Sequence, residues 1–230
     1  MEEAAKLDSV SFIGGLDPFS IDKNIEKAID FTVQLALDNN KGIDIHLHDR
    51  GEEGLRTINF LTELVTKNPQ LKGKTYVSHA FALANLSNVK EQEMAEKLAE
   101  AKVGIVSSVP FKNNIVMPIP TLVKSGVEVL IGNDNVQDYW STFGTGNMLQ
   151  KANLISQLYG LETEYDLSRN LAFATKNITP LDKKGKQQWP NQGDVADIVL
   201  IDASCSAEAV ARKSTVKAYV FKGKLVWKEN

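Results

Sequence analysis

The sequence predicts an α/β fold in which parallel strands alternate with crossover helices. Two observations carry this prediction. Short apolar runs rich in Val and Ile alternate with longer segments of helical periodicity as far as residue 134, and polar residues follow several of the runs. At 230 residues, of which 43% are hydrophobic, the chain is long enough to bury a sizeable core.

Five apolar runs are predicted to be the strands of the sheet. Each has the length of a buried strand and is bounded by turn-forming or polar residues. The runs span residues 9–15, 42–48, 74–80, 102–108 and 127–134. Because helical segments separate them, neighbouring strands are expected to run parallel.

Four segments between these runs are predicted to be the crossover helices. The first spans residues 22–40, and Asp22 is its candidate N-cap. Its apolar residues recur on one stripe, which consists of Ile25, Ile29, Val33 and Leu37. The other three segments span residues 52–68, 89–101 and 119–126.

After Asp134 the pattern changes to two helical segments followed by a β-rich tail. The predicted elements are helices at 145–160 and 166–177 and strands at 196–203 and 217–227, the last with a Gly-centred turn. A polar linker at 182–194 precedes the tail. We therefore expect residues 1–181 to form the α/β domain and residues 182–230 to add a small sheet outside it.

Composition and charge argue against several classes of protein. A formal net charge of −3, with lysines spread along the chain, disfavours nucleic-acid binding. No apolar run approaches the roughly 20 residues of a membrane span, and the acidic N-terminus differs from a secretory signal. We expect a cytoplasmic protein with no membrane partner. Because Cys205 is the sole cysteine, any metal must be held by nitrogen and oxygen atoms.

Polar residues gather at the carboxyl ends of the predicted strands. These residues are Asp17, His46, His48, Asp49, His79 and Asp134. The carboxyl ends of parallel strands meet at one edge, which is where α/β barrels carry out their chemistry. All three histidines of the chain lie there, and imidazole with carboxylate is the ligand set of a catalytic zinc or iron that keeps one position open for water.

Each of these residues also has a purely structural interpretation. A single histidine at a strand end is more often hydrogen-bonded than metal-bound. Asp134 can cap the next helix or form an Asx turn, and Trp140 and Phe143 can be ordinary core residues. The coincidence of all three histidines on one edge favours the metal site, because structural histidines have no reason to gather there.

Four motifs, in this order and at these separations, resemble the cytosine deaminase branch of the amidohydrolase superfamily of metal-dependent hydrolases. They are "IDIHLHD" (43–49), "YVSHA" (76–80), "VLIGNDN" (129–135) and "DYWSTFGTGNMLQ" (138–150). The block 131–149 is the most specific part. The resemblance runs from about residue 9 to the end of the chain, where "ADIVLID" resembles a tail that is common in the superfamily.

This resemblance implies a partial TIM (β/α)8 barrel. If Asp134 follows strand eight, the five apolar runs are strands four to eight, and strands one to three are missing. Missing with them are the family's first HxH metal pair and the N-terminal part of a small β-sandwich, to which the tail contributes C-terminal strands. His46 and His48 imitate that HxH pair, but the strand count places them on strand five.

The resemblance also implies a role for each polar residue. His46 and Asp134 would bind the divalent metal, zinc or iron, with Asp134 also acting as a base, while His79 would polarise the group under attack. Asp49 stands where the family has a glutamate that carries a proton to the leaving amine, and His48 can take part in that transfer. The residues expected to contact the substrate are Trp140, His48 and Asp17.

The implied reaction is hydrolysis of C–N bonds in cyclic amidines or amides, with a pyrimidine- or triazine-like ring as substrate. Three hypotheses remain open. The chain is a working hydrolase completed by another chain or a missing N-terminal half, an inactive fragment, or a protein that keeps only a ring-binding pocket. Because an incomplete barrel exposes open strand edges, we expect a homo-oligomer or a complex with the missing half.

Overall fold

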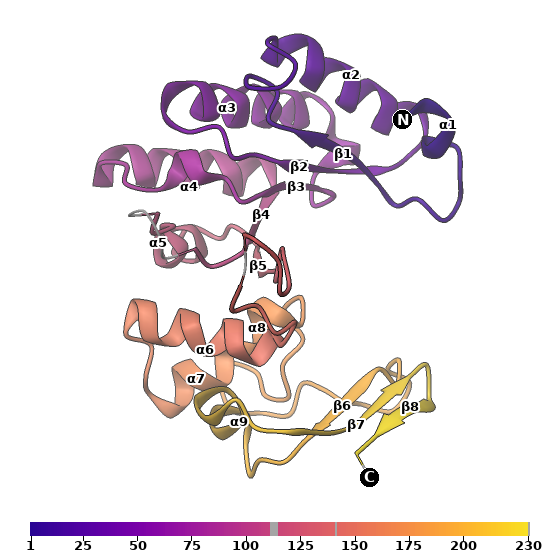
Figure 1. Ribbon diagram of the computed structural model, residues 1–230, viewed down its shortest axis with the longest axis vertical. Coiled ribbons are helices and arrows are strands. Elements are labelled where there is room, and N and C mark those ends of the chain that lie inside the picture. The colour runs from indigo at the N-terminus through magenta and orange to yellow at the C-terminus, as the bar shows by residue number, and fades with distance from the viewer. Residues whose placement is uncertain (111–114, 141, 230) are drawn as a thin grey trace. The chain divides into compact units, whose positions relative to one another are not determined.

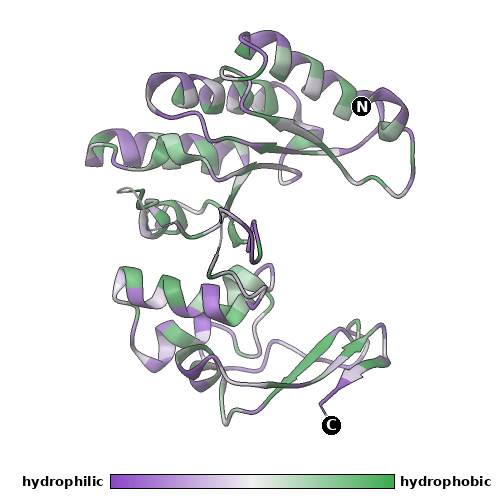
Figure 2. Cartoon of the chain, in the orientation of Figure 1, coloured by the Kyte–Doolittle hydropathy of each residue, from purple (hydrophilic) through white to green (hydrophobic). Residues whose placement is uncertain are grey.

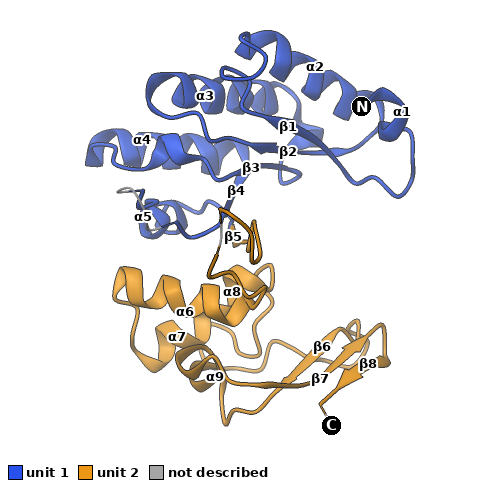
Figure 3. Cartoon of the chain, viewed as in Figure 1, with its two compact units in different colours: residues 1–129 blue, residues 130–230 orange. Residues whose placement is uncertain are grey.

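The computed structural model describes residues 1–110, 115–140 and 142–229. The chain divides into two compact units, Met1–Val129 (unit 1) and Leu130–Asn230 (unit 2), which are coloured separately in Figure 3. The domain boundary expected near residue 181 stays a prediction.

Unit 1 is built on a sheet whose strands follow one another in chain order (Figure 1). The strands are β1 (Phe12–Leu16), β2 (Gly42–His46), β3 (Thr75–Ser78), β4 (Val103–Ser107) and β5 (Val129–Ile131), of which β5 begins at the last residue of unit 1. The pairs β1–β2, β2–β3 and β3–β4 are parallel. The predicted α/β class and parallel sheet are confirmed, whereas the partial barrel stays a prediction.

Helices join these strands and pack beside one another in the same order. They are α2 (Ile25–Asp38), α3 (Gly51–Lys67), α4 (Asn88–Ala101) and α5 (Ile119–Lys124), with 3-10 turns at Pro69–Leu71 (η1) and Phe81–Leu83 (η2), and a short helix α1 (Glu2–Ala5) precedes β1. Contacts link α2 to α3, α3 to α4 and α4 to α5. The helices cover an apolar sheet, in which all four residues of β3 are buried.

The start of α2 differs from the prediction. Asn24, not Asp22, is the N-cap, and its side chain accepts a hydrogen bond from the backbone N–H of Lys27 at 2.9 Å. Capping needs a side-chain oxygen next to the first helical residue, and Asp22 lies two positions too early. The predicted apolar stripe is largely confirmed, because Ile25 and Ile29 are buried.

Unit 2 combines short helices with an antiparallel sheet. The helices are α6 (Met148–Tyr159), α7 (Glu164–Arg169), α8 (Leu171–Ala174) and α9 (Ser206–Arg212), and the strands are β6 (Ile198–Ile201), β7 (Val216–Phe221) and β8 (Lys224–Lys228). The sheet order is β6-β7-β8. Lys222 and Gly223, both with positive φ, form the predicted turn between β7 and β8, as two-residue hairpins with a right-handed strand twist require.

The two units differ in how well their apolar residues are covered. Figure 2 shows hydrophobic residues along the strands of both sheets, but the large apolar side chains of β8 are exposed. Among the described residues, no helix combines the length and the apolar character that crossing a bilayer requires.

Candidate functional site

The three histidines meet at the carboxyl edge of the sheet in unit 1. His46 is the last residue of β2, His48 lies two residues further on, and His79 directly follows β3. The ring centroids of His48 and His79 are 4.2 Å apart, those of His46 and His79 are 5.1 Å apart, and those of His46 and His48 are 6.4 Å apart. The cluster arises because β2 and β3 pair in parallel, with His46 opposite Ser78.

His79 is held in an unusual backbone conformation. His79 and Ala80 both have positive φ, at 68° and 49°, a region that non-glycine residues occupy at a cost and that is enriched at functional sites. The backbone N–H of His79 donates to the carbonyl of Val106 at 2.9 Å, which fixes the end of β3 against β4. The main chain at His79 is therefore fixed at the end of β3, and the side chain is buried.

Phe81 completes the ring cluster and was missed by the sequence analysis. The centroid of its ring lies 5.6 Å from that of His48 and 5.3 Å from that of His79, and both contacts are edge-to-face. The guanidinium of Arg50 also lies over this ring, at 5.7 Å. Phe81 stands two residues after His79, so its position next to a candidate site residue was the available clue.

Asp17 joins the end of β1 to the histidine cluster. Its Oδ2 lies 2.9 Å from His48 Nδ1, and its Oδ1 accepts hydrogen bonds from the backbone N–H groups of His48 and Asp49 at 2.5 and 3.0 Å. A carboxylate next to Nδ1 favours a proton on that nitrogen, so Nε2 is the nitrogen that can take part in the chemistry of the site. Asp17 thus orients the His48 ring, while its predicted contact with substrate stays a prediction.

The carboxylate of Asp49 faces the loop between β1 and α2. Its Oδ2 accepts from the backbone N–H groups of Phe19 and Ser20 at 3.1 and 3.3 Å, and its Oδ1 accepts from the Ser20 hydroxyl. Asp49 is buried. The adjacent turn of α3 is packed so closely that a Cβ on Gly54 would lie 2.2 Å from the Asp49 carbonyl oxygen. Asp49 therefore anchors the loop that carries Asp17.

Asp134 and Trp140 belong to unit 2. Asp134 follows β5 with a positive φ of 61°. Burial lowers the pKa of the Lys151 ammonium, and the negative charge of Asp134 opposes that shift. The side chain of Trp140 is 76% exposed, so Trp140 is not an ordinary core residue of the described structure. Ser141, in the same sequence block, lies outside the described residues.

The histidine cluster fits part of a metal site but not a whole one. Across residues 1–110, 115–140 and 142–229, no group of three or more His, Cys, Asp or Glu side chains is arranged to hold a metal ion. A catalytic zinc usually has three protein ligands and a water molecule. The described side chains offer imidazole nitrogens, and further ligands would have to come from elsewhere.

Imidazole and carboxylate groups at the carboxyl edge of a parallel sheet are typical of metal-dependent hydrolases with strands and helices in alternation. No family model matches the sequence. Two relatives match 94% of the chain: the uncharacterised protein YahJ of Escherichia coli K12, at 49% identity over 216 residues, and the N-isopropylammelide isopropyl amidohydrolase of Pseudomonas sp. strain ADP, at 27% over 220 residues.

Solved structures of the same kinds of enzyme also match the chain. The N-isopropylammelide isopropylaminohydrolase of Burkholderia multivorans superposes with a TM-score of 0.80 at 28% identity, and the match covers 96% of this chain and 56% of that one. A 5-methylcytosine deaminase from Klebsiella pneumoniae shares the fold, with a TM-score of 0.80 at 20% identity over 100% of this chain and 59% of that one. The chain is therefore a homologue of amidohydrolase-superfamily hydrolases and deaminases, as its motifs predicted.

The chain spans about half the length of the curated relatives it matches, 47% of YahJ and 53% of the Pseudomonas enzyme. Deaminases of this superfamily are metal-dependent, and an adenosine deaminase of similar fold from Xanthomonas campestris (TM-score 0.59, 15% identity over 92% of this chain and 50% of that one) has bound zinc.

Proposed function

We propose that this chain contributes the C-terminal part of the active site of a hydrolase that cleaves C–N bonds in a cyclic amidine or amide. The observation that carries the proposal is the convergence of His46, His48 and His79 at the carboxyl edge of a parallel sheet. The names of the relatives favour a pyrimidine- or triazine-like ring as substrate.

In this proposal the metal is zinc or iron, with His46 and Asp134 among its ligands. When bound, such an ion supplies activated water for attack on the ring carbon. The remaining ligands come from the part of the relatives that this chain does not cover.

His79 is proposed to polarise the ring substituent under attack. Its ring is buried, and the bond from its backbone N–H to the Val106 carbonyl fixes the main chain that carries it, so the imidazole is positioned before the substrate binds. Trp140, which is exposed in unit 2, is proposed to cover one face of the ring.

The geometry favours His48 over Asp49 for carrying the proton to the leaving amine. Both oxygens of Asp49 already accept hydrogen bonds from the loop at Phe19 and Ser20. His48 keeps Nε2 for exchange because Nδ1 is bonded to Asp17. An oriented imidazole is a common general acid or base, so we assign proton transfer to His48 and loop support to Asp49.

The test is to complete the chain and measure amine release. The chain is co-expressed with the portion of YahJ that the match leaves uncovered, and release of ammonia or alkylamine from cytosine and from an N-alkylaminotriazine is followed. We expect turnover that His79→Ala abolishes and that exposed Asp30→Asn leaves unchanged. A soluble, metal-loaded complex without turnover on any ring amine would contradict the proposal and favour a ring-binding protein.

A further inference from the structure

Arg50 places a positive charge beside the histidine cluster of unit 1. It directly follows Asp49 and is the N-cap residue of α3, but its side chain makes no capping hydrogen bond. Its guanidinium instead lies over the ring of Phe81, 5.7 Å from the ring centroid, which is the distance of a cation–π contact. The cation is therefore held near the carboxyl edge of the sheet, where the side chain is exposed to solvent.

Phe81 connects this cation to the histidines. Its ring makes edge-to-face contacts with both His48 and His79, and the Arg50 guanidinium lies over the same ring. Its backbone N–H donates to the Leu47 carbonyl at 3.4 Å, which fastens η2 to the end of β2. Because Phe81 is only partly buried, some of its ring is left to contact a molecule that reaches from the histidines to Arg50.

The carboxylates near Arg50 do not neutralise its charge. Among the described residues, no Asp or Glu side chain forms an ion pair with its guanidinium. Asp17 and Asp49 are committed to the hydrogen bonds described above. Glu53 is bonded to Arg56 of the same helix at 3.4 Å. Guanidinium groups bind carboxylates through paired hydrogen bonds, so Arg50 is available to a carboxylate of a bound molecule.

We propose that Arg50 and Phe81 select a substrate whose leaving amine carries a short carboxyalkyl group. This assignment rests on the proposed function, in which His48 gives a proton to the leaving amine. The alkyl stem of the group lies on the Phe81 ring, and its carboxylate is bound by the Arg50 guanidinium. The substrate class is then a ring amine that releases an amino acid or a similar short aminocarboxylate.

The position of Phe81 favours the leaving amine over the ring as the carrier of the carboxylate. Phe81 contacts His48, the proposed proton donor to the leaving nitrogen, and His79, the proposed partner of the attacked group. A substituent on the leaving nitrogen therefore begins next to the Phe81 ring. Arg50 lies over that ring, so a chain of a few carbon atoms brings a carboxylate to the guanidinium.

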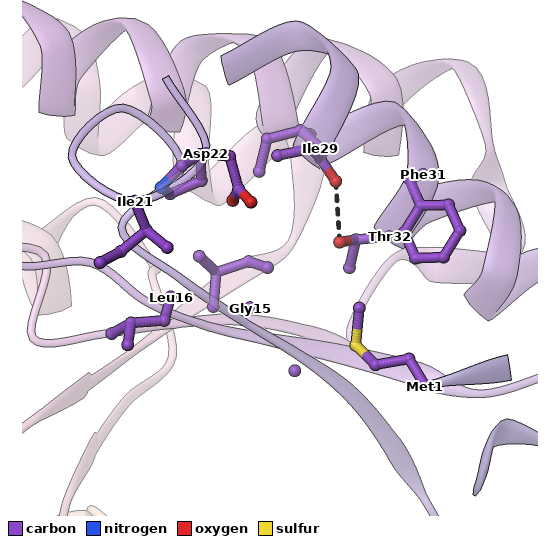
Figure 4. A pocket seen from close by; sticks show the side chains of 12 residues that line it. Met1, Gly15, Leu16, Ile21, Asp22, Ile29, Phe31 and Thr32 are labelled. Atoms are coloured by element: carbon purple, nitrogen blue, oxygen red, sulfur yellow. Dashed lines mark hydrogen bonds between the residues drawn. The ribbon is translucent and has the colours of Figure 1, made fainter. Parts of the chain in front are cut away.

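The cavity between β1 and α2 offers a carboxylate no comparable partner. It has a volume of about 480 Å³, and none of the described residues that line it is Lys or Arg. Figure 4 shows apolar side chains around it, among them Met1, Leu16 and Ile29, together with the carboxylate of Asp22. An anion would be repelled by Asp22, whereas Arg50 attracts it.

The carboxylate takes no part in the bond changes. A water oxygen forms a bond to the ring carbon, the C–N bond breaks with its electron pair going to nitrogen, and His48 gives that nitrogen a proton. The attacking water gives up one proton, so one ring amine and one water yield a hydroxylated ring and an aminocarboxylate. Because Arg50 binds the carboxylate equally before and during the reaction, it acts on KM and not on kcat.

The test uses this chain co-expressed with the uncovered portion of YahJ, and two matched substrates. They are a dihydroxytriazine with a carboxyethylamino group and the same ring with a propylamino group. We expect kcat/KM to be about ten- to a hundredfold higher for the carboxylated compound, as a hydrogen-bonded charge pair provides. The difference should lie in KM.

Variants of Arg50 and Phe81 show whether these side chains carry the preference. Arg50→Gln should lower kcat/KM for the carboxylated compound by about ten- to a hundredfold and leave the propylamino compound within about twofold. Arg50→Lys keeps the charge without the paired donors and should lose less. Phe81→Leu removes the ring that holds the guanidinium and should lose part of the preference. Lys67→Gln removes a charge from the exposed last residue of α3 and is the matched control, which should keep the full preference.

Calorimetric binding of both compounds to the chelator-treated complex separates recognition from hydrolysis. A preference there that depends on Arg50, without hydrolysis of either compound by the metal-loaded complex, upholds the recognition of the carboxyalkyl group and counts against the proposed function alone. Equal kcat/KM for the two compounds, a preference that survives Arg50→Gln, or binding of neither compound would overturn the proposal. An Arg50-dependent preference for 5-carboxycytosine over 5-methylcytosine, in place of the one expected, would also overturn it, because the carboxylate would then belong to the ring.

Discussion

The two sheets of this protein both contain apolar residues, but their surroundings differ. In unit 1, β3 is buried along its whole length between neighbouring strands and under helices. In unit 2, every residue of β8 is exposed, although Leu225, Val226 and Trp227 are apolar. Apolar composition therefore identifies a strand, but burial depends on which layers cover it.

This difference shows that the described residues cover the two sheets to different degrees. Unit 1 buries a continuous core between its sheet and its helices. The three-stranded sheet of unit 2 is largely uncovered by described residues, as expected for the C-terminal strands of a β-sandwich, which stays a prediction. The histidine cluster lies in unit 1, whose sheet is the better buried of the two.

The largest effect is expected at the carboxyl edge of the unit 1 sheet, where the proposed proton transfer takes place. In the completed enzyme, His48→Ala should lower kcat by about 10²–10⁴-fold, the usual contribution of a general acid or base. Asp49→Asn should retain most of the turnover and instead lower the free energy of unfolding by about 1–3 kcal/mol, because a buried acceptor loses strength. Steady-state kinetics and urea unfolding of both variants separate these roles. Full activity in His48→Ala, with loss in Asp49→Asn, would return proton transfer to Asp49.

Metal affinity should also differ between the isolated chain and the chain completed by the uncovered portion of YahJ. The described residues of the isolated chain offer fewer grouped ligands than a catalytic zinc site needs, so we expect dialysis against a chelator to remove zinc or iron from it. The completed enzyme should retain about one ion per chain. Elemental analysis before and after dialysis checks this, and stoichiometric metal that survives the chelator in the isolated chain would show that the described residues suffice.

Core truncation tests whether unit 1 is the self-sufficient half. Leu98 of α4 is fully buried, and Leu98→Ala should cost about 2–5 kcal/mol of unfolding free energy through lost burial and the cavity left behind. Val89→Ala on the same helix is exposed and should stay within about 0.5 kcal/mol. Chemical denaturation followed by far-UV circular dichroism measures both. A small cost for Leu98→Ala would mean that unit 1 is loosely packed in solution.

A buried tyrosine in unit 1 gives this core a pH dependence. Burial, and then the hydrogen bond from the Tyr76 hydroxyl to Glu128 at 2.7 Å, raises the pKa of Tyr76 to about 12. The folded state therefore holds this proton more tightly than the unfolded state does. The resulting stability is fully present below pH 10 and is lost as pH rises from 10 to 12, by about 1–3 kcal/mol.

Tyr76→Phe should reduce the fall of the free energy of unfolding with rising pH, and urea unfolding at pH 9, 10 and 11 measures that fall. Burial also raises the pKa of Tyr159 in unit 2 to about 12, so the slope that remains in Tyr76→Phe belongs partly to that residue. Tyr139→Phe, at an exposed position, is the control and should keep the full slope. An unchanged slope in Tyr76→Phe would mean that the Tyr76 hydroxyl is accessible to water.

The sheet of unit 1 was predictable from sequence because its strands are continuous Val- and Ile-rich runs whose order follows the chain. The meeting of His46 with His79 followed from parallel pairing alone. The bonds of Asp17 and Asp49 were not predictable, because they depend on the loop after β1, where Asp17 and Lys23 adopt positive φ. Local spacing also decided the cap of α2, where Asn24 is adjacent to the first turn and Asp22 is not.

The smallest effect is expected at the uncovered sheet of unit 2. In the isolated chain, Val226→Thr on β8 should change the free energy of unfolding by less than about 0.5 kcal/mol, because the side chain is 59% exposed and loses little burial. In the completed enzyme the same substitution should cost about 1–2 kcal/mol, if a second layer buries that side chain against β8. Thermal unfolding of the variant in both states measures the difference, with Lys224→Thr at the start of the same strand as the control. Equal, small effects in both states would show that β8 faces solvent in the whole enzyme, and the sandwich prediction for the C-terminal tail would be wrong.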